Sequence, residues 1–270
     1  MNYILLEKKS DYSLTSGQYF FDDFASNKIS IKVEQNSTVE ILCKNVGKIE
    51  SINCDIEGGS YVKFLLLARS NDVNFVFNSN VKGNAKIDCY FADFSSKEST
   101  ILSDINLLDN ESTCNWNLSS LGIANDLKKI DVNIYHKHSN TFSLINNYGV
   151  SRNESKIIFS GISHIEKGSN NSKAHQNAKI MVFDKESSGV AKPILKIDEN
   201  EIEASHAAVV GKISDDQLFY LCSRGLSVNQ ARELITYGYL KPILNGFDDD
   251  TRNEINSLME DRIWAMMSTK

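Results

Sequence analysis

The stretch PILKIDENEIEASHAAVVGKISDDQLFYLCSRGLSVNQARELITYGYLKPIL, residues 193–244, contains the change of structural period that divides this chain. Up to Val210 the apolar residues come in short blocks typical of β-strands. From Ser214 onward they recur every three to four residues, which is typical of a helix. Ser214, followed three residues later by Gln217, has the form of a capping box, and Ser227 followed by Gln230 repeats it. We therefore expect a β body that is followed by a helical tail.

Upstream of this change the chain alternates apolar and polar residues in short blocks that are joined by polar, Asn- and Ser-rich segments. Blocks of this length, rich in Ile, Val, Phe and Tyr, predict β-strands. The expected strands are residues 29–34, 37–43, 60–68, 73–78, 85–91, 113–119, 128–136, 141–147, 155–161, 178–184, 193–198 and 201–209. Many short strands with only two prolines fit either an antiparallel sandwich or a parallel β-helix. The strands themselves do not decide between these two architectures.

Several motifs in the C-terminal half of the chain occur in a fixed order. They are His136 with Thr141 and Ser143; Phe159-Ser160-Gly161; Pro193, Leu195 and Ile197; His206; Val210-Gly211; the run from Asp216 to Leu221; Ser223-Arg224-Gly225; and Ala231. As a set they resemble the SufB/SufD family, whose members are subunits of an iron–sulfur cluster assembly scaffold. The resemblance extends from about residue 130 to residue 240 and is faint before that.

The resemblance chooses between the two β architectures, because the SufB/SufD core is a right-handed β-helix. The expected fold is thus mainly β, a right-handed parallel β-helix with a C-terminal α-helical tail. We expect an N-terminal lead-in or cap at residues 1–28, a β-helix core at residues 29–212 and a helical domain at residues 213–270. Family members carry a further region before the β-helix, so this chain resembles a short form of the family.

Both ends of the expected solenoid need a cover, because its last turn exposes unpaired backbone groups and an apolar face. At the start of the chain, four aromatic residues predict a cluster that packs over one end: Tyr19, Phe20, Phe21 and Phe24. At the other end the helical tail is the expected cover. Its last helix, residues 251–267, has an apolar face formed by Ile255, Leu258, Met259, Ile263 and Met266.

Composition and charge exclude several classes of function. The chain of 270 residues has a net charge of −6, whereas a protein that binds nucleic acid irrespective of sequence needs a basic face. No apolar run reaches the length of a membrane span, and the N-terminal residues do not have the pattern of a signal peptide. We therefore expect a cytoplasmic protein with no nucleic-acid or membrane partner.

The five cysteines are scattered and show neither a CxxC motif nor metal-ligand spacing: Cys43, Cys54, Cys89, Cys114 and Cys222. This pattern predicts reduced thiols that behave as small buried hydrophobic residues. Whether any of them handles sulfur stays open at this point.

His206 is the residue to which the resemblance gives the most weight. The family's histidine at this position is implicated in cluster assembly at the interface of the two scaffold subunits, and a neutral imidazole can bind iron or carry a proton. SufB-type subunits have a glutamate directly after this histidine and a cysteine on a preceding strand. Here Ala207 follows the histidine, and the strand around Gln176 to Ala178 has no cysteine. The chain thus resembles SufD, and we expect it to hold no stable cluster or metal alone, only a transient cluster at the subunit interface.

Two other histidines are candidates for a site. His136 matches a family position, and His138 lies two residues further on, so the two would share a face if both were on one strand. This is a weak signal for a metal site, and no metal ligand is assigned.

The helical tail is the expected docking surface for a partner. In the family it binds SufC, an ABC-type ATPase, and the residues expected to take part here are Phe219, Tyr220 and Arg224. Arginine offers a planar fork of donors, and aromatic residues are favoured as anchors of interfaces, as Trp264 near the chain end would be. Helical spacing places Cys222 beside Leu218 and Leu221 on an apolar face, which favours burial over reactivity.

These observations predict a non-catalytic, SufD-like scaffold subunit of the SUF machinery that pairs with a SufB-like subunit or with itself as a homodimer, and docks the ATPase. Two alternatives remain: a β-helix enzyme acting on acidic polysaccharides, and a purely structural β-helix. The enzyme would need clustered carboxylates, or clustered Arg and Lys, on one solvent face and usually an export signal, and neither feature is evident. No nucleotide-binding GxxxxGK[ST] motif occurs, so ATP must be bound by another chain.

Overall fold

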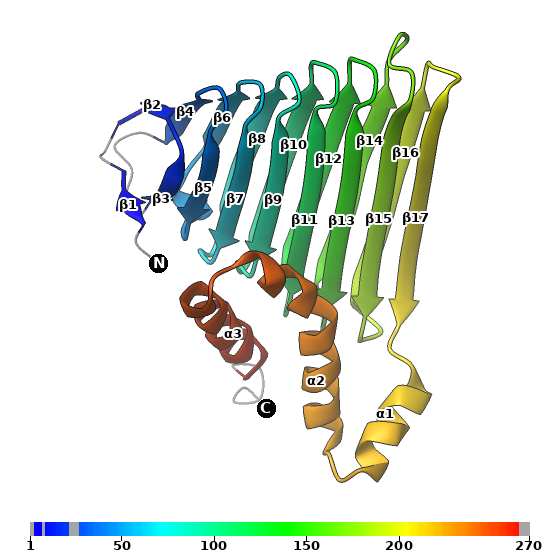
Figure 1. Ribbon diagram of the computed structural model, residues 1–270. Helices are drawn as coiled ribbons and strands as arrows, with labels where there is room; N and C mark the ends of the chain where they lie inside the picture. Colours follow the sequence, from blue (N-terminus) through cyan, green and yellow to red (C-terminus); the bar gives the residue numbers. More distant parts are fainter. Residues whose placement is uncertain (1–2, 7–8, 22–26, 265–270) are drawn as a thin grey trace.

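The computed structural model describes residues 3–6, 9–21 and 27–264, which form a parallel β-solenoid with a C-terminal helical region (Figure 1). One sheet contains the odd-numbered strands in the order β1 (Ile4–Leu5), β3 (Gly17–Phe21), β5 (Thr38–Cys43), β7 (Tyr61–Ala68), β9 (Lys86–Asp93), β11 (Thr113–Gly122), β13 (Phe142–Ser151), β15 (Ser172–Val182) and β17 (Ile202–Lys212). The other contains β2 (Asp11–Leu14), β4 (Lys28–Val33), β6 (Ser51–Ile56), β8 (Val73–Val81), β10 (Glu98–Leu107), β12 (Leu127–His136), β14 (Lys156–Ile165) and β16 (Ser188–Ile197). Successive strands alternate between the sheets, and the neighbours within each sheet pair in parallel.

The expected parallel β-helix is confirmed, and the antiparallel sandwich is excluded. The expected boundary at residue 28 is wrong, because β2 and β3 already pair with β4 and β5 as part of the same two sheets. Tyr19 and Phe21 in β3 are buried, as expected for the aromatic cluster, whereas Phe24 lies outside the described residues. β6 and β10 were not among the expected strands.

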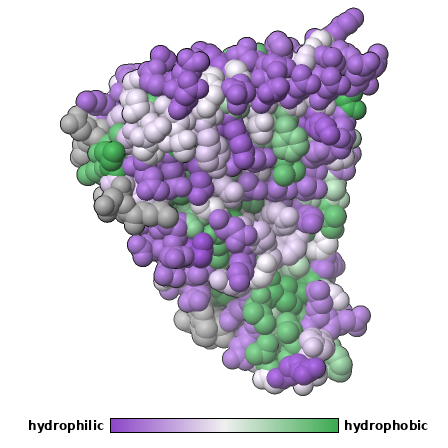
Figure 2. Space-filling view, viewed as in Figure 1, coloured by the Kyte–Doolittle hydropathy of each residue, from purple (hydrophilic) through white to green (hydrophobic). Residues whose placement is uncertain are grey.

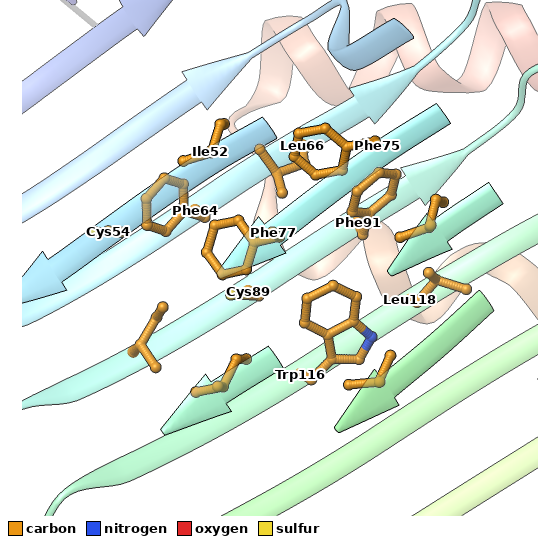
Figure 3. Close-up of a cluster of buried hydrophobic side chains, with 14 of the residues drawn as sticks. Ile52, Cys54, Phe64, Leu66, Phe75, Phe77, Cys89, Phe91, Trp116 and Leu118 are labelled. Carbon is orange, nitrogen blue, oxygen red and sulfur yellow. The ribbon is translucent and has the colours of Figure 1, made fainter. Parts of the chain in front are cut away.

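The interior is built by strict alternation of inward and outward side chains. In parallel pairing each residue lies beside a residue of the next turn that points the same way, so inward positions form continuous columns. Phe64, Phe75, Phe77, Phe91 and Trp116 fill the middle turns, with a centroid distance of 5.0 Å between Phe64 and Phe77 (Figure 3). Such aromatic contacts add stability beyond the area that they bury.

The turns lengthen along the chain, and their filling changes. Gly17 pairs with Val39, 22 residues later, whereas Lys173 pairs with Glu203, 30 residues later. Toward the end of the chain the buried inward positions carry small or polar side chains instead of large aromatic ones: Ser143, Asn147, Ser163, Ala174, Gln176 and Ala178. The last turns therefore have a more polar interior than the first ones.

Asparagine stabilises the turns and the outer face. Four turn residues adopt a positive φ, which asparagine tolerates better than most residues: Asn36, Asn140, Asn153 and Asn171. On the nine-stranded sheet the Asn146 amide donates to Asn117 Oδ1, and the Asn177 amide donates to Asn146 Oδ1, each at 3.1 Å. Such hydrogen-bonded ladders of side chains stabilise the arrangement in which successive turns stack in register.

The tail consists of α1 (Asp215–Ser223), α2 (Val228–Leu240), the 3-10 helix η2 (Lys241–Gly246) and α3 (Asp249–Trp264). The expected caps are present. The Ser214 hydroxyl accepts from the backbone N–H of Gln217, and Ser227 forms a reciprocal capping box with Gln230. No helix of the described residues is both long enough and apolar enough to cross a membrane.

The tail does not cover the last turn of the solenoid, which corrects the expectation. It runs back along the outer face of the nine-stranded sheet, toward the first turns (Figure 1). A second hydrophobic cluster joins the two parts, and its buried members are Leu42, Leu65, Leu67, Ala92, Phe94, Leu121, Ile123, Val150 and Phe183 of the solenoid with Leu240, Ile243, Leu244, Phe247, Ile255, Met259 and Ile263 of the tail. The apolar face expected for the last helix is thus buried against the solenoid, while Met266 lies outside the described residues.

Charged contacts hold α3 over the early turns. Glu254 pairs with Lys44 at 2.7 Å and with Arg69 at 2.6 Å. Arg262 pairs with Asp126 and donates to the carbonyl oxygen of Phe94. These contacts and the shared hydrophobic cluster make the tail an integral part of the fold.

Lys128 lies fully buried near this contact, and sequence reasoning did not single it out. Its ammonium group donates to Ser95 O at 2.7 Å and Ser95 Oγ at 2.6 Å, and lies 3.3 Å from Asp93 Oδ1. Burial lowers the pKa of Lys128, and the neighbouring Asp93 carboxylate opposes that change. A buried charge is tolerated here because its donors are satisfied.

Gly161, the last residue of the Phe-Ser-Gly motif, should be required for folding. A Cβ atom at this position would lie 2.1 Å from the carbonyl oxygen of Val132 on β12, and Ile162 beside it donates its backbone N–H to Asn133 Oδ1 instead of to the ladder. We expect Gly161→Ala to lower the free energy of unfolding by about 3 kcal/mol or more, measured by denaturant titration. Gly211→Ala, where a Cβ atom meets nothing within 4 Å, is the matched control and should change stability little. Equal stability of the two variants would contradict this account.

Candidate functional site at the open end of the solenoid

The last turn of the solenoid, formed by β16 and β17, is open. β17 pairs only with β15 and β16 pairs only with β14, and no other described residue pairs with their outer edges (Figure 1). Ile194, Ile197, Val209 and Val210 on these two strands are large exposed hydrophobic residues. Unpaired backbone groups beside apolar side chains are the features of a surface that pairs with another chain.

His206 lies in the middle of β17, on this open end. It pairs in register with Gln176, whose side chain is buried in the interior column. By the same register His206 continues that column, and it is exposed because no further turn follows. His206 lies within the strand itself, with six residues of β17 still to follow before the tail.

The surroundings of His206 combine a polar base with an apolar rim. Gln176 Nε2 donates to Ser163 Oγ at 2.7 Å and to the carbonyl oxygen of Ile194 at 3.0 Å, which ties both sheets together under the histidine. The neighbours of His206 on the same face of β17 are Ala204 and Ala208. His206 itself has no hydrogen bond or ion pair with any described residue, so its imidazole is available to an incoming group.

Ala207 follows His206 and faces the outer side of the sheet, in register with Asn177. A carboxylate at this position would therefore point away from the interior column that contains His206. Neither Gln176 nor Ala207 offers a thiolate or carboxylate, so of these three residues only His206 has a side chain of a type that commonly binds metals.

His136, unlike His206, is enclosed by the protein and hydrogen-bonded at both ring nitrogens. It is fully buried at the end of β12, where Nδ1 lies 2.7 Å from Thr141 Oγ1 and Nε2 lies 2.7 Å from Ser143 Oγ. The three residues of the His…Thr-x-Ser motif thus form one hydrogen-bonded cluster. Burial, with a smaller contribution from the charge of His164, lowers the pKa of His136 to about 4. The ring is neutral near pH 7, and both of its nitrogens are engaged.

His138 does not share a strand face with His136, because β12 ends at His136. His138 is exposed in the following turn, and its Nδ1 accepts from the backbone N–H of Ser139. No group of three or more His, Cys, Asp or Glu side chains in the described ranges is arranged to hold a metal ion.

The four cysteines of the solenoid core lie in its earlier turns and do not reach the open end. Cys43, Cys54, Cys89 and Cys114 are fully or almost fully buried in the core, where burial raises the pKa of each thiol, that of Cys43 to about 12. Thiols that stay protonated are poor nucleophiles and poor metal ligands. Cys222, on α1, is partly exposed.

The residues expected to dock a partner gather on α1. Phe219 is 76% exposed and Tyr220 is 57% exposed, and the Arg224 guanidinium lies 5.3 Å from the centroid of the Tyr220 ring. Beside them a groove of about 510 Å³ runs between α1, α2 and β15, lined by Met181, Leu221, Ile235 and Tyr239 among others. Figure 2 shows the hydrophobic surface over this helical region. The side chain of Trp264 lies outside the described residues.

Comparisons with known proteins point to one family. A family model described as "SUF system FeS cluster assembly, SufBD core domain" matches residues 14–239. The iron–sulfur cluster assembly protein SufD of Bacillus subtilis (strain 168) is 31% identical over 144 residues, which are 53% of this chain and 33% of the relative. An iron–sulfur cluster assembly SufBD family protein of Staphylococcus aureus (strain USA300) is 32% identical over 125 residues, 46% of this chain and 27% of the relative. The similar segment thus spans a third or less of the length of these relatives.

The buried His136 makes stability depend on pH. Its pKa of about 4 in the folded chain lies below the ordinary value of 6.5, so unfolding takes up a proton between these values and stability falls as the pH drops through them. This histidine should account for a loss of about 2 kcal/mol in the free energy of unfolding between pH 7 and pH 5. His136→Gln should lose this part of the pH dependence, whereas His138→Gln, with its exposed ring, should keep it. An unchanged pH profile in His136→Gln would show that the buried ring is not responsible.

Proposed function

Because the chain belongs to the SufB/SufD family of the SUF system for iron–sulfur cluster assembly, we propose that it is a non-catalytic, SufD-like scaffold subunit. The observation that carries the proposal is the position of His206, an exposed imidazole that continues the interior column of the solenoid at its open end. A partner that pairs with this end would bring its own side chains over the histidine. The cluster is the cargo assembled between the two chains.

The SufD-like assignment rests on which ligands the open end offers. Iron–sulfur clusters are held mainly by cysteine thiolates, and the four core cysteines are buried with raised pKa values. Ala207 and Gln176 supply neither a carboxylate nor a thiol beside His206. The thiolates are therefore expected from the partner, and the chain by itself is expected to hold no stable cluster. Unpaired thiols also fit a reducing compartment such as the cytoplasm.

Pairing through β16 and β17 is the second part of the proposal. The outer edge of β17 offers a row of backbone donors and acceptors, and Val209 and Val210 add exposed apolar surface. A second solenoid that adds its own terminal strand would extend the sheet and bury this surface. The partner is a SufB-like subunit or a second copy of this chain. Mass measurement of the chain alone and mixed with a SufB-like subunit distinguishes the two.

Docking of a SufC-like ABC ATPase to α1 is the third part. The exposed Phe219 and Tyr220, with Arg224 stacked on the latter, have the composition of an interface anchor. α1 begins three residues after the end of β17. A movement of α1 imposed by an ATPase would thus act directly on the strand that carries His206.

His206→Ala should separate assembly from folding. The imidazole is exposed and has no bond with a described residue, so the free energy of unfolding should change by no more than about 0.5 kcal/mol. Cluster formation on the complete complex, followed by visible absorption under anaerobic conditions, should be lost, and the isolated wild-type chain should give no stoichiometric chromophore. His138→Ala, also an exposed histidine, should be normal in both assays. Normal cluster formation by a well-folded His206→Ala complex would end the functional claim for this residue.

Replacement of both Phe219 and Tyr220 by serine should weaken ATPase binding without unfolding the chain. Both side chains are mostly exposed on α1, so the thermal midpoint should stay nearly the same. Loss of two aromatic anchors should raise the Kd for the SufC-like ATPase by about 10- to 100-fold, measured by calorimetry.

Leu234→Ser is the matched control, because Leu234 is 52% exposed on α2 of the same tail. It should bind the ATPase as the wild type does. If the Leu234 variant loses binding while the double serine variant keeps it, the docking surface lies on α2 instead of α1.

A further inference from the structure

Arg152, in the turn after β13, is a buried cation whose charge is not paired. The residue is 7% exposed, and Nε and Nη1 of its guanidinium are buried without a hydrogen-bond acceptor. Among the described residues no carboxylate forms an ion pair with it. Leaving donors of a charged group buried and unsatisfied is costly, so such a group calls for a missing partner.

Lys128 shows how the same protein treats a buried cation elsewhere. Its ammonium group has a carboxylate neighbour, Asp93, and two oxygen acceptors of Ser95. Arg152 has none of these compensations at Nε and Nη1. The contrast indicates that the position of Arg152 is not explained by packing alone.

A second guanidinium increases the positive charge around Arg152. Arg152 and Arg232 of α2 lie 5.5 Å and 5.2 Å from the centroid of the same Phe183 ring. The neighbouring carboxylate, Asp184, pairs with Arg232 and accepts from the backbone N–H of Asn153. Among the described residues Asp184 forms its ion pair with Arg232, not with Arg152. Burial lowers the pKa of Arg152 and repulsion from Arg232 lowers it further, while the nearby Asp184 and Glu233 carboxylates oppose this change without forming an ion pair with Arg152.

We infer that Arg152, with Arg232 beside it, forms a binding site for a small oxyanion of the phosphate or carboxylate class, between the turns after β13 and β15 and helix α2. An oxyanion provides the acceptor oxygens that the Arg152 donors lack and a negative charge in direct contact with the Arg152 guanidinium. A guanidinium presents parallel N–H groups that match two oxygens of a carboxylate or phosphate. A water molecule would satisfy donors but would leave the charge unpaired.

The site lies where α2 contacts the solenoid. Arg232 belongs to α2, whereas Arg152 and Phe183 belong to turns of the solenoid. An anion bound by both arginines would bridge the two parts and stabilise the docked position of the tail. Anion binding should therefore be visible as thermal stabilisation of the whole chain.

The test compares the full chain in chloride buffer with the same chain in inorganic phosphate or malonate at matched ionic strength. At ten times its Kd, the bound anion should raise the Tm of the wild type by about 3–5 °C. Arg152→Met should lose this response, and its Tm in chloride should be no lower than that of the wild type, because an unpaired buried charge is removed. Phosphate and malonate, as separate arms, distinguish a phosphate site from a carboxylate site.

Lys129→Met is the control for general salt effects, because Lys129 is an exposed cation on the opposite sheet, paired with Glu98. It should respond to the anion as the wild type does. Calorimetric titration of the wild type with each anion should show saturable binding with a stoichiometry near one. An equal Tm shift in all three proteins, or no saturable binding of either anion, would overturn the proposal. The titration decides the matter even if Arg152→Met does not fold.

Discussion

The parallel register of the two sheets is the constraint on which the rest of the structure depends. Each residue lies beside a residue of the next turn that faces the same way, so a side chain that points inward extends a column through the whole solenoid. The column must be filled at each turn, and it must end somewhere. In the middle of the solenoid one such column is filled by the aromatic rings of Phe64 and Trp116. At the end of the solenoid the same column finishes with His206, above the buried Gln176.

The parallel register also explains why the two surfaces proposed for partner binding lie apart, one at the open end of the solenoid and one on the helical tail. A solenoid has a lateral face and two ends, and the tail covers the lateral face by packing Leu240, Ile255 and Met259 onto the nine-stranded sheet. The open end is the surface that we propose to pair with another chain. Because the tail is part of the core, its removal would expose the apolar outer face of the sheet, so partner docking is better probed by exposed residues such as Phe219 than by truncation.

Buried polar residues in this fold fall into two groups. His136 and Lys128 are surrounded by partners that satisfy them, and both have pKa values lowered by burial. Arg152 is buried to a similar degree without an acceptor for two of its nitrogens. Motif matching ranked His136 and passed over Arg152, because a sequence pattern records which residues recur and carries no information on whether a buried donor finds its acceptor.

The sequence by itself determined the β body and the tail with its Ser214 and Ser227 caps, and its resemblance to a family singled out His206 as a candidate. Local alternation and capping need only neighbouring residues, so they can be read from one chain. It missed β10, because inward serines such as Ser99 and Ser103 hide the apolar alternation of that strand. Only the tertiary structure decided that residues 9–21 are already solenoid, that the tail lies along the side instead of over the end, and that His206 is exposed while His136 is enclosed. Each of these depends on which surfaces meet across long sequence separations, and that follows from the total apolar area buried, not from any local pattern.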